Sequence, residues 1–290
     1  MRTPSVLPAA LLLALASSAF AQKAVPATPG TAAPQCSGGW GADEAALRQT
    51  ASALFAKLID QSHKGVTVDG KKIDYAKNPT FKVDLNHAVI GGSPAAAFQA
   101  GVGLNKTGDF SGSDLVYAGS ALFEMCDPSE AAMFLAHEIG HLAYGHPKAM
   151  EDKKLVIVDR LYGEWETSHT IPAGEASSVT VNRFFKDTSD KLTKELSPLQ
   201  QPMEDDADKY GLALSVQAGY PADAAVNSFR RAQDWLWALK LDMSDPNHPG
   251  TVADRAKQTA ERVAADRAAA QRAADVTRRA ACASGGMSCQ

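Results

Sequence analysis

The stretch His137-Glu138-Ile139-Gly140-His141 determines how the rest of this chain is interpreted. Residues i and i+4 of an α-helix share one face, so His137 and His141 can reach a single metal ion. Glu138 lies between them, where its carboxylate can act as general base for a water that the ion activates. Two neutral imidazoles and a carboxylate at this spacing are typical of zinc-dependent hydrolytic sites. The stretch therefore predicts a zinc site on a helix.

The flanking residues predict that helix. Asp127 suits the N-cap, Pro128 the first helical position, and Glu130 the closing position of a capping box. Gly145 offers a stop at the other end. Gly140 should cost the helix about 1 kcal/mol relative to alanine. Its presence suggests that another backbone segment or a substrate approaches the helix closely at this point.

His146 follows the paired histidines closely enough to be considered as a third ligand. It lies nine residues beyond His137, which is about 180° around a continuous helix. On such a helix it would point away from the metal face. We therefore expect His146 to lie at the helix terminus, or to contact a metal ligand without binding the metal itself.

A third ligand is expected from a later acidic segment. Glu204 and Asp208 follow Pro202, which suits the first turn of a new helix. The two carboxylates are again i and i+4, so they project from one face. One could bind zinc while the other hydrogen-bonds a ligand histidine and fixes its tautomer. Taken alone, an acidic first turn that only complements the helix dipole is the alternative.

These segments resemble metallopeptidase family 48, the HtpX/BepA-type gluzincin zinc endopeptidases. The resemblance begins with residues 132–141, followed by Tyr144-Gly145-His146. The family's E-x-x-A-D motif is matched by Glu204, Ala207 and Asp208. The resemblance covers roughly residues 85–260.

The resemblance implies a role for each matched residue. His137, His141 and Glu204 would bind one Zn²⁺ per chain, and Asp208 would orient a ligand histidine. Glu138 would be the general base of a zinc metalloendopeptidase of the EC 3.4.24 type. The fold implied is a zincin-like catalytic domain, with a small β-sheet beside the zinc-binding helix and helices that carry the third ligand.

A later His-Pro element followed by an arginine is also typical of the family, and His248-Pro249 with Arg255 fits it. His248 or Arg255 would then act catalytically by stabilising the oxyanion of the tetrahedral intermediate. Alternatively, the loop that carries His248 caps the zinc and keeps the enzyme latent. An extended substrate is expected to pair with the strand near Val116-Tyr117.

Residues 1–21 are expected to be a secretory signal peptide. Arg2 precedes an apolar run over residues 11–15, and Ala19-Phe20-Ala21 provides an A-x-A cleavage site. A retained membrane anchor is the alternative, although the apolar run is short. No later stretch has the roughly 20 apolar residues of a spanning helix. These features favour the soluble periplasmic branch of the family.

The cysteine content fits an exported protein. Cys36, Cys126, Cys282 and Cys289 form an even set, which suggests disulfides. The pair Cys282–Cys289 is close in sequence, and it would leave Cys36 to join Cys126. Free thiols are the alternative. No C-x-x-C spacing indicates a zinc role.

The chain is expected to form a single α+β domain that is predominantly helical. Residues 22–42 predict a flexible linker, residues 43–281 the zinc metallopeptidase domain, and residues 282–290 a C-terminal tail. Within the domain, residues 43–60 predict an amphipathic helix and residues 65–120 a small sheet.

A charged insertion over residues 148–200 separates the two halves of the expected site. It could form a cleft wall or a lid, or it could be an inert connector. From residue 129 onward helices are expected to dominate.

Charge and resemblance together limit the partners. The net charge of −4 predicts no nucleic-acid binding. The resemblance implies unfolded or misfolded envelope polypeptides as substrates, contact with envelope assembly machinery, and no stable membrane insertion. A different hypothesis is a periplasmic chaperone or assembly factor with a structural or latent metal site. Glu138 argues against it, because a structural site has no use for a base there.

Overall fold

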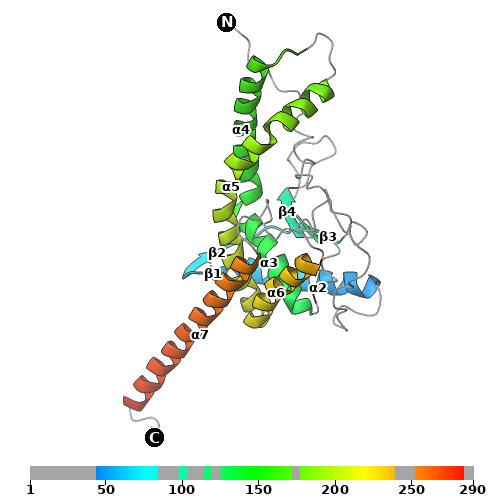
Figure 1. The fold of residues 1–290 in the computed structure, drawn as a ribbon. Coiled ribbons are helices and arrows are strands. Elements are labelled where there is room, and N and C mark those ends of the chain that lie inside the picture. The colour runs from blue at the N-terminus through cyan, green and yellow to red at the C-terminus, as the bar shows by residue number, and fades with distance from the viewer. Residues whose placement is uncertain are drawn as a thin grey trace.

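Helices form most of the described chain, arranged as a body with two projections (Figure 1). The computed structural model describes residues 44–83, 98–102, 114–118, 125, 127–171, 177–238 and 252–283. A pair of long helices rises from one side of the body, and a single helix extends from the opposite side. The expected class, α+β and predominantly helical, is therefore confirmed.

Several expectations fall on other parts of the chain. The signal peptide, the linker and most of the C-terminal tail lie outside the described residues. So do His248 and the side chains of all four cysteines. The disulfide pairing therefore stays a prediction.

The first described helix, α2 (Glu44–His63), confirms the amphipathic helix expected over residues 43–60. Its buried side chains recur at helical spacing, among them Leu47, Leu54 and Leu58. They share one hydrophobic core with buried residues of α3 (Pro128–Tyr144). α2 therefore packs against the helix that carries the paired histidines.

Two small sheets form where one was expected. Strands β1 (Val66–Val68) and β2 (Lys71–Ile73) make an antiparallel hairpin. Its two turn residues, Asp69 and Gly70, have positive φ values of 48° and 76°, as a type I′ turn requires.

The second sheet has three strands in the order β3-β5-β4. They are β3 (Thr80–Val83), β4 (Phe98–Val102) and β5 (Asp114–Ala118). The central strand β5 runs parallel to β3 and antiparallel to β4. β4 also contacts α3, so this sheet lies beside the helix that carries the paired histidines, as the zincin-like arrangement implies.

Helix α3 begins and ends where the sequence predicts. The Asp127 side chain accepts a backbone N–H of the first turn at 2.7 Å, and Pro128 begins the helix. Gly145 ends the helix in the left-handed region, at φ 71°. The Glu130 carboxylate accepts a hydrogen bond from Arg231 of a later helix at 2.7 Å, which ties the two helices together.

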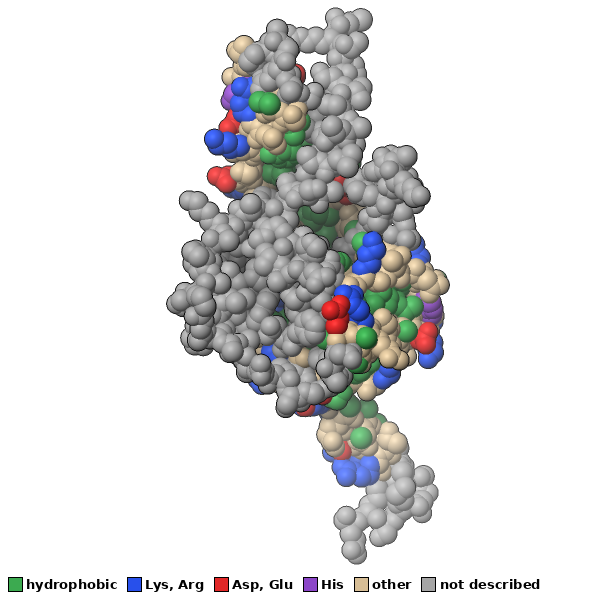
Figure 2. All heavy atoms as spheres, turned by 90° about the vertical axis from the view of Figure 1, so that its right-hand side faces the viewer, with side chains coloured by type: hydrophobic (Ala, Val, Ile, Leu, Met, Phe, Trp, Pro, Cys, Tyr) green, Lys and Arg blue, Asp and Glu red, His purple; other side chains and the backbone are tan. Residues whose placement is uncertain are grey.

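The charged insertion forms a helical hairpin. It consists of α4 (His146–Ser168) and the first stretch of α5 (Ser177–Gln217). The two helices pack through an apolar cluster separate from that of the body: Val158, Leu161, Trp165, Val181, Phe184, Leu192 and Leu196. The exposed surface of the hairpin carries acidic and basic side chains close together (Figure 2).

The expectation that Pro202 begins a new helix is wrong. α5 is continuous from Ser177 to Gln217 and contains both Pro198 and Pro202. A proline inside a helix costs about 3 kcal/mol, because it removes a hydrogen bond and crowds the preceding turn. α5 packs against α4 along one stretch and against α3 along the next, and this packing offsets the cost.

The last two helices, α6 (Ala222–Ala238) and α7 (Val252–Ala283), pack against each other. With Met133 of α3 they form a third apolar cluster, to which α7 contributes Ala256 and Val263. Residues 264–279 of α7 are exposed except for the partly buried Asp275, and this part of the helix extends away from the body (Figure 1). No helix in the described part of the chain is long and apolar enough to cross a membrane.

Candidate metal centre

Helices α3 and α5 meet at two glycines, and this contact brings the two halves of the site together. A Cβ added to Gly140 would lie 3.1 Å from the Cα and carbonyl oxygen of Ala207. A Cβ added to Gly211 would lie 2.8 Å from the backbone nitrogen of His137 and 2.9 Å from its Cα. The backbone that approaches Gly140 is therefore that of α5.

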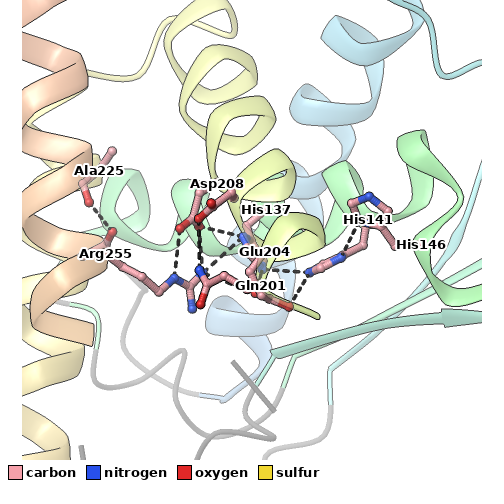
Figure 3. A network of polar contacts seen from close by, with 10 residues as sticks. His137, His141, His146, Gln201, Glu204, Asp208, Ala225 and Arg255 are labelled. Atoms are coloured by element: carbon pink, nitrogen blue, oxygen red, sulfur yellow. Dashed lines mark hydrogen bonds and ion pairs between the residues drawn. The ribbon is translucent and has the colours of Figure 1, made fainter. Parts of the chain in front are cut away.

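His137, His141 and Glu204 form a compact cluster at this contact (Figure 3). The Nε2 atoms of the two histidines are 3.0 Å apart. The Glu204 carboxylate spans them, with Oε2 3.2 Å from His137 Nε2 and Oε1 3.4 Å from His141 Nε2. His137 and Glu204 are buried, and His141 is partly buried.

The donor set fits a zinc ion. Nitrogen and oxygen ligands about 2.0–2.1 Å from a tetrahedral zinc are separated from one another by about 3.3 Å. The distances of 3.0, 3.2 and 3.4 Å between the donors bracket that value. Two imidazoles and one carboxylate also leave the fourth tetrahedral position for a reactant, as in catalytic zinc sites. The residues that could hold the metal are the three that the sequence predicted.

A buried ion pair supports His137 from the side away from this cluster. Asp208 Oδ1 lies 2.9 Å from His137 Nδ1 and accepts that N–H when Nε2 faces a metal. Arg255 of α7 donates to the Asp208 carboxylate through Nε at 2.9 Å and through a terminal nitrogen at 2.7 Å. The same terminal nitrogen is 3.8 Å from Glu204 Oε2. One forked contact thus fixes α7 to the site.

Burial and charge move the pKa values of this group in opposite directions. Burial alone would raise the pKa of Asp208, but the charge of Arg255 and hydrogen bonds from His137 and Arg255 hold it well below its usual range. Burial alone would lower the pKa of His137, but hydrogen bonds to Asp208 and Glu204 raise it to about 9. An incoming metal ion therefore has to displace a proton from His137.

His146 lies on the other side of the cluster, against His141 (Figure 3). The Nδ1 atoms of the two rings are 2.9 Å apart, and the His146 ring stacks on Tyr144 with a centroid distance of 5.4 Å. The angle of 180° assumed a continuous helix, and that premise is wrong because α3 ends at Tyr144. Gly145 turns the chain so that His146 begins α4 beside the site. Burial, followed by the charge of His141, lowers the pKa of His146 to about 4.

Of the three candidate catalytic residues, the structure describes Glu138 and Arg255 but not His248. Glu138 follows His137 on α3 and is 4% exposed. Arg255 is bound to Asp208, a geometry that favours positioning of His137 over direct contact with an oxyanion. His248 lies outside the described residues, and its role stays a prediction.

The strand expected to bind substrate is not available for it. Val116 and Tyr117 lie in β5, which pairs with β3 on one side and with β4 on the other. Their backbone hydrogen-bonding groups are therefore used within the sheet. Among the described strands of this sheet, the edge strand β4 contacts both α3 and α4.

One structural contribution at the site was not anticipated. The contact of His146 with His141 at the start of α4 agrees with the expectation that His146 lies at the helix terminus or touches a ligand, and only the direction predicted for its side chain was wrong. The role of Gly211 was missed. A glycine seven residues after Glu204 gives no local sign that it faces the backbone of His137.

The arrangement is that of the zinc metallopeptidase class, because two helices bring together three side chains that could hold a metal ion, and the residue after the first of them is a buried glutamate. Comparison with protein families defines it more closely. The model of Peptidase family M48 matches residues 71–275, and the chain belongs to this family. The resemblance drawn from the motifs is thereby confirmed, and membership implies zinc metallopeptidase activity. Searches of curated proteins and of solved structures gave no match.

Proposed function

We propose that this protein is a zinc-dependent endopeptidase that hydrolyses unfolded or misfolded polypeptides in the periplasm. The observation that carries the proposal is the convergence of His137, His141 and Glu204 at donor distances suited to zinc. Bound there, a zinc ion would supply Lewis-acid activation of water at neutral pH. The remaining chemistry belongs to side chains of this chain.

Glu138 is the proton-transfer group of the proposed mechanism. It takes the proton of the attacking water and returns it to the leaving amine. Only 4% of the Glu138 surface is exposed, so its carboxylate is shielded from bulk solvent. The proton that it takes from the water is therefore passed to the leaving amine and is not exchanged with solvent.

Asp208 and Arg255 hold His137 in the form that can bind metal. Asp208 holds the proton on His137 Nδ1, so the proton that an incoming ion displaces is the one on Nε2. Arg255 keeps Asp208 ionised through its two hydrogen bonds. His248 remains the candidate for the oxyanion donor, or for a cap on the zinc.

The outer edge of β4, which no described strand covers, is where we expect the substrate to bind. An extended peptide adds a strand to a sheet edge through main-chain hydrogen bonds. Among the described strands of this sheet, β4 is the edge strand in contact with α3 and α4. A chain has to be locally extended to pair there, which supports unfolded polypeptides as the substrate class.

The N-terminal sequence supports export to the periplasm. Its charged start, its short apolar run and Ala19-Phe20-Ala21 have the pattern of a cleavable signal peptide. Fractionation of cells that express the full chain should place it in the periplasm with Gln22 as its first residue. A protein that stays in the cytoplasm with Met1 intact would contradict this part of the proposal.

The mechanism is tested with Glu138→Gln, assayed on casein with and without a chelator. Loss of a general base should slow cleavage by about 100- to 10,000-fold. Glu166→Gln, at an exposed position in the hairpin, is the matched control and should cleave like the wild type. Equal cleavage by the Glu138 variant would remove the proposed base. If the wild type cleaves nothing but suppresses aggregation of casein, the chaperone hypothesis replaces the peptidase.

The ligand set is tested by zinc content. Glu204→Ala should lose most of its zinc at micromolar free metal, because one of three protein ligands is gone. Asp205→Ala removes the neighbouring carboxylate, which binds Gln201, and should keep its zinc. Undiminished zinc in the Glu204 variant would exclude it as a ligand.

A further inference from the structure

The two ligand histidines are supported by different partners on their outer nitrogens. His137 contacts the charged pair of Asp208 and Arg255, whereas His141 contacts another histidine. We propose that His146 is a positioning residue, which holds the His141 ring in the orientation and tautomer that zinc binding requires. This inference rests on the proposed zinc site, and it adds a residue that does not itself reach the metal.

The placement of protons in the pair supports this role. A histidine that binds metal through Nε2 carries its proton on Nδ1 and donates it to a neighbouring acceptor. His141 Nε2 points at His137 and Glu204, and its Nδ1 lies 2.9 Å from His146 Nδ1. Two Nδ1 atoms share one proton at this distance when the second ring is neutral and has its own proton on Nε2. The contact therefore fixes both tautomers at once.

His146 is itself held in place. It is 8% exposed, and its ring lies nearly parallel to that of Tyr144, with an interplanar angle of 10°. It is the first residue of α4, directly after the left-handed Gly145, so the turn between the two helices sets its position. An acceptor fixed by packing and by backbone can orient a ligand that is only partly buried.

Direct metal binding by His146 does not fit the geometry. Among the described residues, the group that can hold one ion consists of His137, His141 and Glu204. The nitrogen of His146 nearest the site contacts His141 on the side opposite to His141 Nε2. His146 therefore acts through His141.

The test compares two substitutions of His146. His146→Phe keeps an aromatic ring to stack on Tyr144 but removes the acceptor. His146→Asn loses the ring but places an amide oxygen near the position of Nδ1. We expect zinc affinity, measured by chelator competition on the full chain, to fall about 10- to 100-fold in the Phe variant and only about threefold in the Asn variant. kcat should follow the same order, with KM little changed.

The order of the two variants separates positioning from packing. If His146 only fills space, the Phe variant should bind zinc with the affinity of the wild type, or at least more tightly than the Asn variant does. Either result would overturn the inference. His169→Phe is the matched control, because His169 also stacks on an aromatic ring, Trp165, but in the hairpin. It should leave zinc affinity unchanged. A wild-type chain that binds no zinc would instead overturn the proposed site itself.

Discussion

The two stretches of α5 pack against their neighbours in opposite ways. In the hairpin, α5 meets α4 through large apolar side chains such as Phe184, Leu192 and Leu196. At the site, α5 meets α3 through Gly211 and Ala207, with no room for a Cβ on the glycine. The same helix therefore keeps its partner apart by side-chain volume in one stretch and touches it with its backbone in the other.

This difference follows from what each contact has to achieve. Glu204 and Asp208 are short side chains, so they reach His137 only if the two helix backbones are very close. The hairpin has no such requirement, and ordinary apolar packing with surface ion pairs, such as Arg160 with Glu195, is sufficient. We therefore expect the site stretch to be sensitive to volume and charge, and the hairpin stretch to depend only on buried apolar contact.

The largest expected effect tests the independence of the hairpin. Phe184→Ala removes a fully buried ring that contacts Tyr162 and Trp165, and should destabilise the hairpin by about 3–5 kcal/mol. Zinc affinity should change by less than about threefold, because the hairpin has its own apolar cluster. Urea unfolding and chelator competition measure the two quantities. Val156→Ala, at a position 68% exposed, is the control. A parallel loss of zinc affinity would show that the two stretches unfold as one.

The second prediction concerns the charges of the site stretch. In the metal-free protein the pKa of His137 is about 9, against 6.5 for an ordinary histidine. A raised pKa stabilises the fold fully below about pH 6.5, and this stabilisation is lost as the pH rises through about 9. The free energy of unfolding with chelator present should fall by about 3 kcal/mol across that range.

Denaturant titrations at several pH values check this dependence. With zinc the slope should reverse, because the metal displaces the proton and binds more tightly as the pH rises. His169→Gln, in the hairpin, should leave both slopes unchanged. A flat curve for the metal-free wild type would mean that His137 carries no extra proton between the two carboxylates.

The same contrast explains how far the sequence could predict the structure. His137 and His141 were predicted because helical spacing and the chemistry of zinc ligands are local rules. Those rules left Glu204 and Asp208 as alternatives, and the family resemblance selected Glu204; the proximity of the three residues is as expected. The continuity of α5 was not predicted. Locally a proline signals the start of a helix, and only the packing of α5 against two partner helices overrides that signal. The contact of His146 depends on a turn at Gly145 that a straight-helix calculation ignores.

The third prediction tests the backbone contact directly. A methyl group at Gly211 meets backbone atoms of His137, which cannot move aside without shifting α3. Gly211→Ala should therefore destabilise the body by about 1–3 kcal/mol. It should also weaken zinc binding at least about tenfold, because separation of the helices moves Glu204 away from both histidines. Thermal unfolding and chelator competition measure the two effects. Wild-type zinc affinity in this variant would mean that the site tolerates wider helix spacing than proposed.

The smallest expected effect has the opposite sign and comes from the same substitution in the hairpin. Gly163 lies within α4, and a Cβ added there would meet nothing within 4 Å. Gly163→Ala should stabilise the hairpin by up to about 1 kcal/mol, because alanine loses less backbone entropy in a helix than glycine does. Zinc affinity and casein cleavage should match those of the wild type. If both glycine variants were destabilised alike, the loss at Gly211 would not come from the close approach of α3 and α5. Opposite signs would assign the strain at Gly211 to its contact with His137, since the chemical change is identical at both positions.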